Sequence, residues 1–126
     1  MTIDTHHFGE IEFNEDKILR FDNGLFGFEA HQQFLLISRE DDLFYWLVSI
    51  LEPKIAFPLI GMRLIDENYP EEAENEAFGI VNLNRDPLKI TVNLKAPVYI
   101  NQDKKSGYQK ILDNDRFIID YKLFVE

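Results

Sequence analysis

Residues 91–101 read Thr-Val-Asn-Leu-Lys-Ala-Pro-Val-Tyr-Ile-Asn, and this stretch contains the clearest structural signal in the chain. Apolar side chains recur at Ile90, Val92 and Leu94, with polar ones between them. Because successive side chains of a β-strand point to opposite faces, this pattern predicts a strand with one buried face. Pro97 has no amide hydrogen for a sheet and interrupts the pattern, which Val98 resumes. The stretch therefore indicates a β-fold.

The rest of the chain gives the same kind of signal. Many short apolar or alternating runs separated by turn residues are typical of a barrel or sandwich. The 11 Phe, 5 Tyr and 1 Trp also favour strands over helices. We expect strands at 8–13, 17–21, 33–38, 43–50, 59–65, 78–83, 88–95, 108–112 and 117–125, with Pro53 and Pro58 bracketing a connector.

The predicted fold class is all-β, a single-domain antiparallel pseudo-barrel that spans residues 1–126. We expect at most a short helix near residues 70–77, because Pro70 suits a first helical turn and the acidic residues after it suit the positive end of a helix.

The charge balance bounds the partners. The 13 basic and 23 acidic residues give a formal net charge of −10, which repels phosphate backbones. We therefore expect no direct nucleic-acid binding and favour a basic protein partner over it, although acidity also serves solubility alone. No apolar run is long enough to cross a membrane, and residues 1–10 show no secretory signal, so we expect a cytoplasmic protein.

Residues that carry chemistry are sparse. The chain has no Cys, which excludes thiolate nucleophiles and thiolate-bound metals. His6 and His7 are neighbours that would point to opposite faces of a strand, so they and His31 are expected to be exposed and to bind no metal. No phosphate-binding loop or nucleophile elbow is present. We predict that the chain is not an enzyme and has no cofactor.

Four segments together resemble one known family. Residues 21–29 are similar to the Phe-x-x-Gly-Leu-Pro-Gly-Phe-Glu signature of the FliW-type flagellar assembly factors, with Phe26 where proline is usual. Residues 44–57 resemble the family's Phe-x-Trp-Leu-Gln-Ser…Pro…Phe segment. Residues 91–101 and 107–112 are similar to its Thr-Val-Asn-Leu-x-Ala-Pro-Ile-x-x-Asn block and the Gly-x-Gln-x-Ile-Leu that follows. Residues 59–76 fit the family poorly.

This resemblance implies a non-enzymatic bacterial protein of flagellum biogenesis with an all-β pseudo-barrel. Members of the family bind CsrA, a small dimeric RNA-binding translational repressor, and so relieve repression of the flagellin message. They also bind flagellin itself in the cytoplasm, like a chaperone, and the two partners exclude each other. Flagellin that accumulates would thus release the repressor, and export of flagellin would reverse the effect.

An acidic segment, residues 66–76, is the first candidate for partner binding. Its acidic side chains are Asp66, Glu67, Glu71, Glu72, Glu74 and Glu76. No Lys or Arg occurs between Arg63 and Arg85, which predicts a strongly negative local field. One interpretation is a surface that attracts basic residues of CsrA and keeps RNA away. The other is a solvated loop.

Asn93 and Lys95 are the second candidate, because they form the polar face of a strand beside a proline-interrupted edge. Such an edge is suited to receive a terminal segment of flagellin. Alternatively, Asn93 bonds the neighbouring backbone and Lys95 is solvated or protects the edge. Trp46 lies in a run that is apolar on both faces, so we predict it in the core.

Two other functions stay open from sequence. A small-molecule-binding β-barrel, for instance one that holds a flavin, is the main alternative and needs a concave apolar site with a few polar groups. A small-molecule ligand is the less favoured reading, because no motif for one is present. A hydrolase comes third, since no nucleophile–base pair can be recognised.

Overall fold

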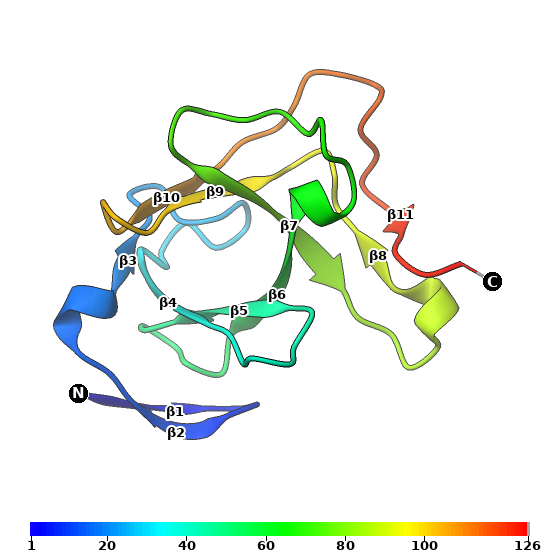
Figure 1. The fold of residues 1–126 in the computed structure, drawn as a ribbon. Helices are drawn as coiled ribbons and strands as arrows, with labels where there is room; N and C mark the ends of the chain where they lie inside the picture. Colours follow the sequence, from blue (N-terminus) through cyan, green and yellow to red (C-terminus); the bar gives the residue numbers. More distant parts are fainter. Residues whose placement is uncertain (126) are drawn as a thin grey trace.

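Residues 1–125, which the computed structural model describes, form β-strands and three short 3-10 turns, with no α-helix (Figure 1). The strands are β1 (Thr2–Thr5), β2 (Gly9–Glu12), β3 (Leu19–Arg20), β4 (Gln33–Ile37), β5 (Tyr45–Ser49), β6 (Ala56–Gly61), β7 (Glu76–Asn82), β8 (Thr91–Val92), β9 (Val98–Asn101), β10 (Ser106–Gln109) and β11 (Tyr121–Lys122). The 3-10 turns are η1 (Glu15–Lys17), η2 (Met62–Leu64) and η3 (Pro87–Lys89). The all-β prediction is confirmed.

Seven of the strands close a barrel in the order β3-β4-β5-β6-β7-β9-β10, with β10 returning to β3. Each pairing is antiparallel except the last, which is parallel and joins Ser106 to Arg20. The amide of Arg20 donates to the Lys105 carbonyl at 2.9 Å across this seam. The barrel is therefore mixed and not purely antiparallel, because β3 and β10 run in the same direction where they pair and close the barrel.

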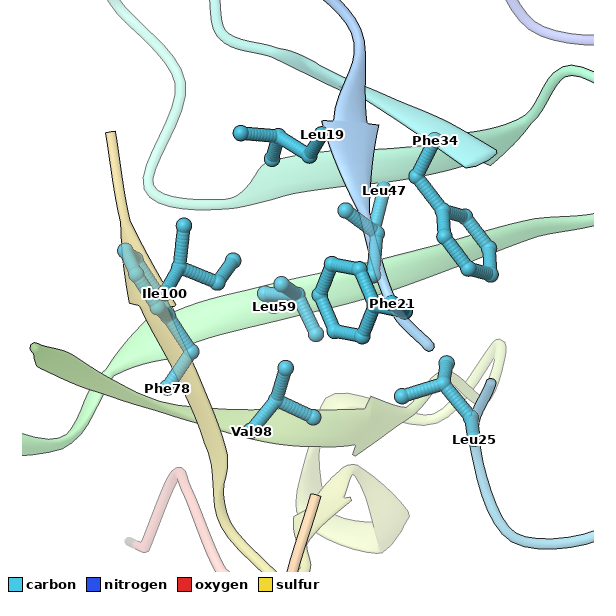
Figure 2. Packing of buried hydrophobic residues seen from close by; sticks show 9 residues of the cluster. All are labelled: Leu19, Phe21, Leu25, Phe34, Leu47, Leu59, Phe78, Val98 and Ile100. Carbon is cyan, nitrogen blue, oxygen red and sulfur yellow. The ribbon is translucent and has the colours of Figure 1, made fainter. Parts of the chain in front are cut away.

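The interior of the barrel is filled by side chains. Figure 2 shows the nine residues of this cluster, Leu19, Phe21, Leu25, Phe34, Leu47, Leu59, Phe78, Val98 and Ile100. The rings of Phe21 and Phe34 meet edge to face with centroids 5.1 Å apart. A Cβ added at Gly107 would lie 2.3 Å from the Phe21 ring, so only glycine lets β10 approach this ring closely.

Two further apolar clusters lie outside the barrel. The hairpin β1–β2 packs Ile3 and Phe13 against Leu35 and Val48 on the outer face of β4 and β5. The pair β8–β11 branches from the second half of β7, as Figure 1 shows at the right of the barrel. It helps to bury the second outer cluster, which consists of Ile60, Met62, Tyr69, Val81, Ile90, Val92, Leu94, Leu112 and Phe117.

The structure divides the stretch 91–101 into two strands. Ile90, Val92 and Leu94 are buried in an outer cluster while Asn93 and Lys95 are only half-buried, so the predicted alternation is confirmed. The turn at 94–96 then redirects the chain, and Val98 and Ile100 point into the barrel. Every residue of β9 is buried, because its other face is also covered.

Several elements differ in detail from the sequence expectations. The expectation of at most a short helix near residues 70–77 is met without one, since Glu72 bridges Asn75 around a tight turn in which Ala73 has φ 52°. Pro58 lies inside β6 and not in a connector. It pairs with Trp46 of β5, whereas the pairing of β6 with β7 covers only Leu59–Gly61. The proline therefore has a partner strand on one side only, and its missing amide hydrogen is tolerated there.

The run 117–125 forms only the two-residue strand β11, because its partner β8 is equally short. Ile119 and Val125 would share a strand face with the buried Phe117, but both are exposed. The strand expected at 8–13 is present as β2, but it is the second strand of the chain: β1 precedes it, and residues 6–8 are the turn of the β1–β2 hairpin.

Candidate protein-binding site

Tyrosines anchor the start of the acidic segment to the body of the protein. The hydroxyl of Tyr69 donates to the Leu94 carbonyl at 2.5 Å, and that of Tyr99 donates to the Pro70 carbonyl at 3.1 Å. Tyr69 is buried and its ring packs on Phe117. Burial raises the pKa of the Tyr69 hydroxyl well above its usual range and that of Tyr99 to about 12. Both hydroxyls therefore stay protonated donors at neutral pH.

Glu72 is clamped at the middle of the segment. Its carboxylate accepts hydrogen bonds from the Tyr108 hydroxyl and the Lys110 ammonium, and Asn75 donates to the same tyrosine oxygen at 3.3 Å. The bond from Lys110 and then the one from Tyr108 hold the pKa of Glu72 below its usual range. Glu72 thus ties the loop to the outer face of β10, and its side chain stays partly exposed.

Two other acidic side chains of the segment are paired. Arg116 Nη2 lies 3.3 Å from Asp66 Oδ2, and Arg63 forms an ion pair with Glu71. Glu67, Glu74 and Glu76 have no ion pair with any residue of the described chain. The negative field predicted from sequence is therefore weaker than expected at the paired positions, because Lys110 and Arg116 reach the segment from far along the chain. It is concentrated on the unpaired carboxylates.

A groove of about 540 Å³ lies between η2 and the acidic segment. Glu71, Glu74 and Glu76 line it, and we call it the acidic groove. Its apolar lining includes Tyr45, Met62, Leu64, Tyr69, Pro70, Ala73 and Ala77. The Leu64 side chain is 71% exposed beside it. Acidic groups around apolar surface are suited to a basic, amphipathic polypeptide segment.

The second candidate pair lies next to the acidic segment. The Tyr69 bond to the Leu94 carbonyl joins the turn that holds Asn93 and Lys95 to the residues around Asp66. The Asn93 side chain is engaged in the turn, since its Oδ1 accepts from the amides of Lys95 and Ala96 at 3.0 Å. The bonding of Asn93 to neighbouring backbone, expected as the alternative, is thus observed.

The edge beside Pro97 is covered. The amides of Lys110 and Leu112 donate to the carbonyls of Pro97 and Lys95, at 3.2 and 2.8 Å. A partner strand that added at this point would have to displace these bonds. Lys95 itself is half-buried and its ammonium makes no ion pair within residues 1–125.

Residues of the family-like segments hold the fold together. The Gln109 side chain donates to the Ala96 carbonyl at 3.0 Å and accepts from the Phe26 amide at 2.9 Å, so it joins three of the four segments. Asn101 Oδ1 accepts from the Lys104 amide and caps the turn between β9 and β10. Gln109 and Asn101 therefore stabilise the fold through hydrogen bonds to the backbone, and neither lines the acidic groove.

Sequence reasoning missed several groove residues. Tyr45, Leu64 and Arg63 line the acidic groove, but nothing in their local sequence distinguishes them from core or solvated positions. The run of acidic residues at 66–76 pointed to this region, but it did not single out these three side chains.

The histidines and Trp46 also depart from expectation. His6 and His7 are exposed, as predicted, but lie in a turn. His31 is half-buried, and its Nδ1 lies 2.7 Å from the Ser49 hydroxyl. Trp46 is half-buried on the outer face of β5, so its placement in the core is wrong: the interior side of that strand belongs to Leu47.

Comparisons with known proteins bear on the family and on the fold of the chain. The family model described as FliW protein matches residues 2–78 and 68–123. The chain belongs to the FliW family of flagellar assembly factors. A flagellar assembly factor FliW of Thermoanaerobacter pseudethanolicus is 39% identical, with 100% of this chain and 95% of the relative covered. One of Thermosipho africanus is 37% identical over 91% of this chain and 90% of the relative.

A solved structure shares the whole fold. The crystal structure of a flagellar assembly factor FliW superposes with a TM-score of 0.91 at 29% identity, covering 100% of this chain and 99% of that one. The FliW family consists of non-enzymatic assembly factors, so the prediction of no enzymatic activity is confirmed by family membership. Within residues 1–125, no helix has the length and apolar character needed to span a membrane.

Proposed function

We propose that this flagellar assembly factor acts in the cytoplasm by binding two competing polypeptides, the repressor CsrA and flagellin. The acidic groove is the observation that carries the proposal. An RNA-binding repressor needs a basic surface, and Glu74 and Glu76 offer it unpaired carboxylates beside apolar side chains. The same charges disfavour RNA on the bound repressor.

The adjacency of the two candidate regions supports competition. Binding of one partner must disfavour the other, which needs either an overlapping surface or two coupled ones. The Tyr69 bond to Leu94 holds the acidic segment against the turn of Asn93 and Lys95. In this proposal CsrA occupies the acidic groove, and flagellin contacts the neighbouring turn through Lys95 and overlaps the groove.

The ligand-in-barrel alternative is disfavoured by the packing. Phe21, Phe34 and Phe78 are fully buried among the aliphatic side chains that fill the interior (Figure 2). A flavin-sized ligand would have to displace these rings. The acidic groove lies at the surface and not inside the barrel.

The test is a double charge reversal, Glu74→Lys with Glu76→Lys. These two positions are chosen because Glu72 is clamped and its reversal would disturb the loop itself. We expect CsrA affinity at low salt to fall by about tenfold or more, which corresponds to about 1.4 kcal/mol. Asp113→Lys with Asp115→Lys is the matched control, since both residues are exposed and neither lines the groove.

Calorimetric titration with purified CsrA measures the affinity, and a pull-down from lysate with and without excess flagellin measures the exchange. Equal CsrA affinity of the groove variant and the control would overturn the assignment of this groove. Capture of CsrA that is unaffected by saturating flagellin would overturn the competition.

A further inference from the structure

A second groove, of about 480 Å³, lies on the opposite side of β5 from the barrel interior. It lies between the tip of the β1–β2 hairpin, the turn between β4 and β5, and the C-terminal residues. Its rings are those of His7, Phe8, Phe44, Trp46 and Phe124, and we call it the aromatic groove. Nothing in the proposed function uses these residues.

The rings lie at the edge of the two outer apolar clusters, where Phe44 and Trp46 pack on buried residues and remain half-buried. Trp46 is half-buried, and the His7 ring packs on it with centroids 4.2 Å apart. Phe8 meets Trp46 edge to face at 6.1 Å. The Phe124 and Leu43 side chains are 39% and 46% exposed, so part of this apolar surface is open to solvent. Large apolar side chains exposed together mark interaction sites more often than solitary ones do.

One ring of the groove already carries a cation. The Arg39 guanidinium carbon lies 4.5 Å from the centroid of Phe8, within the range of a cation–π contact. The turn that supplies Arg39 also supplies Asp41 and Asp42, and both carboxylates line the groove. Neither carboxylate has an ion pair with any residue between 1 and 125.

This combination selects a cationic ligand. Ring faces attract ammonium and guanidinium groups through their quadrupole, and carboxylates add a direct charge and hydrogen-bond acceptors. Within the groove, the two unpaired carboxylates of Asp41 and Asp42 outnumber the single guanidinium of Arg39. Over the whole chain, the net charge of −10 favours a basic partner and disfavours nucleic acid. The exposed Leu43 and Phe124 are suited to an apolar side chain beside the cation.

We propose that the aromatic groove binds an arginine or lysine side chain of a partner polypeptide, held between its rings and the carboxylates of Asp41 and Asp42. An apolar neighbour of that cation packs on Leu43 and Phe124. This surface is separate from the acidic groove, and the proposal does not depend on which partners the acidic groove binds.

The test uses the intrinsic fluorescence of Trp46, because it is the only tryptophan of the chain. The protein is titrated with the peptide acetyl-Leu-Arg-Leu-Arg-amide and, as a neutral match, with acetyl-Leu-Gln-Leu-Gln-amide. We expect a saturable change with the arginine peptide and binding of the glutamine peptide that is weaker by about threefold or more. The difference between the two peptides should shrink as salt is added.

Variants separate the groove from general charge. Asp41→Asn with Asp42→Asn should weaken the arginine peptide by about threefold or more, whereas Asp113→Asn with Asp115→Asn, which changes the net charge equally, should leave its affinity within about twofold. Phe124→Ala removes an exposed ring near the end of the chain, and it should also weaken binding while the thermal unfolding midpoint stays close to that of the parent protein.

Two outcomes would overturn the proposal. One is equal binding of the arginine and glutamine peptides, including no binding of either at ~10 mM, a concentration well above that expected for weak single-site contacts. The other is an arginine-peptide affinity that the groove variants do not change. Both readouts use neither CsrA nor flagellin, so this proposal and the proposed function fail separately.

Discussion

The barrel interior and the acidic segment are held in opposite ways. Phe21, Phe34 and Phe78 are fully buried among other apolar side chains, whereas the acidic segment lies over the outside of β9 and β10 and is tied by hydrogen bonds and ion pairs. Burial of rings excludes water and contributes most of the stability, while exposed ion pairs contribute little. Under the proposed function, the residues that stabilise the fold and those that recognise partners belong to different regions of the protein.

The separation follows the family resemblance. Residues that resemble the FliW pattern, such as Asn101 and Gln109, bond to backbone groups of the barrel. The segment 59–76, which lies outside the four family-like segments, supplies most of the acidic groove. The comparison predicts that variants of the interior change stability without changing the binding surface, and that variants of the segment do the reverse.

Phe21→Ala should have the largest effect on stability. The ring is fully buried and contacts Phe34 and Gly107, so its removal leaves a cavity and should cost about 3–5 kcal/mol of unfolding free energy. Urea denaturation followed by circular dichroism measures this loss. The folded fraction should bind partners with unchanged affinity; a loss of less than about 1 kcal/mol would contradict the role of this ring in the core.

Trp46→Ala should cost less than a core tryptophan. Full burial predicts a loss of about 3–5 kcal/mol, but the ring is half-buried, so we expect about 2 kcal/mol. The same urea denaturation, followed by circular dichroism, measures the loss. Tryptophan fluorescence does not serve here, because the variant has no tryptophan. A loss as large as that of Phe21→Ala would place Trp46 among the stabilising rings and weaken the case for a binding surface.

Tyr69→Phe tests the join between the two regions. It removes the donor to the Leu94 carbonyl and leaves that buried oxygen without this partner, at a cost of about 1–2 kcal/mol. Because the bond positions the acidic segment, CsrA affinity should also fall. Tyr121→Phe is the control, since its hydroxyl is at an exposed position. Normal CsrA affinity in a destabilised Tyr69→Phe protein would show that the segment is positioned by other contacts.

Glu72→Gln should have the smallest effect on stability, and that effect should depend on pH. The pKa of Glu72 is lowered by its bonds to Lys110 and Tyr108, so its carboxylate stabilises the folded state above the unfolded pKa of about 4.5 and loses this contribution as pH falls through the lower folded value. The parent should therefore be more stable than the variant at pH ~7, and the difference should shrink toward pH ~3. Thermal unfolding at both pH values measures it; a difference independent of pH would exclude the carboxylate charge as its cause.

Sequence patterns predicted the barrel better than the candidate site. The alternation through Ile90, Val92 and Leu94 correctly identified buried positions, because one strand face is local information. Alternation does not settle burial by itself: Ile119 and Val125 have the parity of the buried Phe117 but are exposed, because the pattern states which residues share a face and not whether anything covers that face. Whether the residues after Pro70 form a short helix or a turn was left open by sequence, because contacts distant in the chain, through Tyr99 and Tyr108, fix that segment as a turn.

The amino-acid sequence by itself determined the all-β class, the net charge and the family, because composition, alternation and motif order are properties of the chain as written. Only the tertiary structure decided which carboxylates stay free. Lys110 and Arg116 neutralise Glu72 and Asp66 across long stretches of chain, and charges pair by distance in space and not by separation in sequence. Trp46 likewise lies beside the hairpin tip, where the His7 ring packs on it, because contacts between segments distant in the chain decide what covers each face of β5.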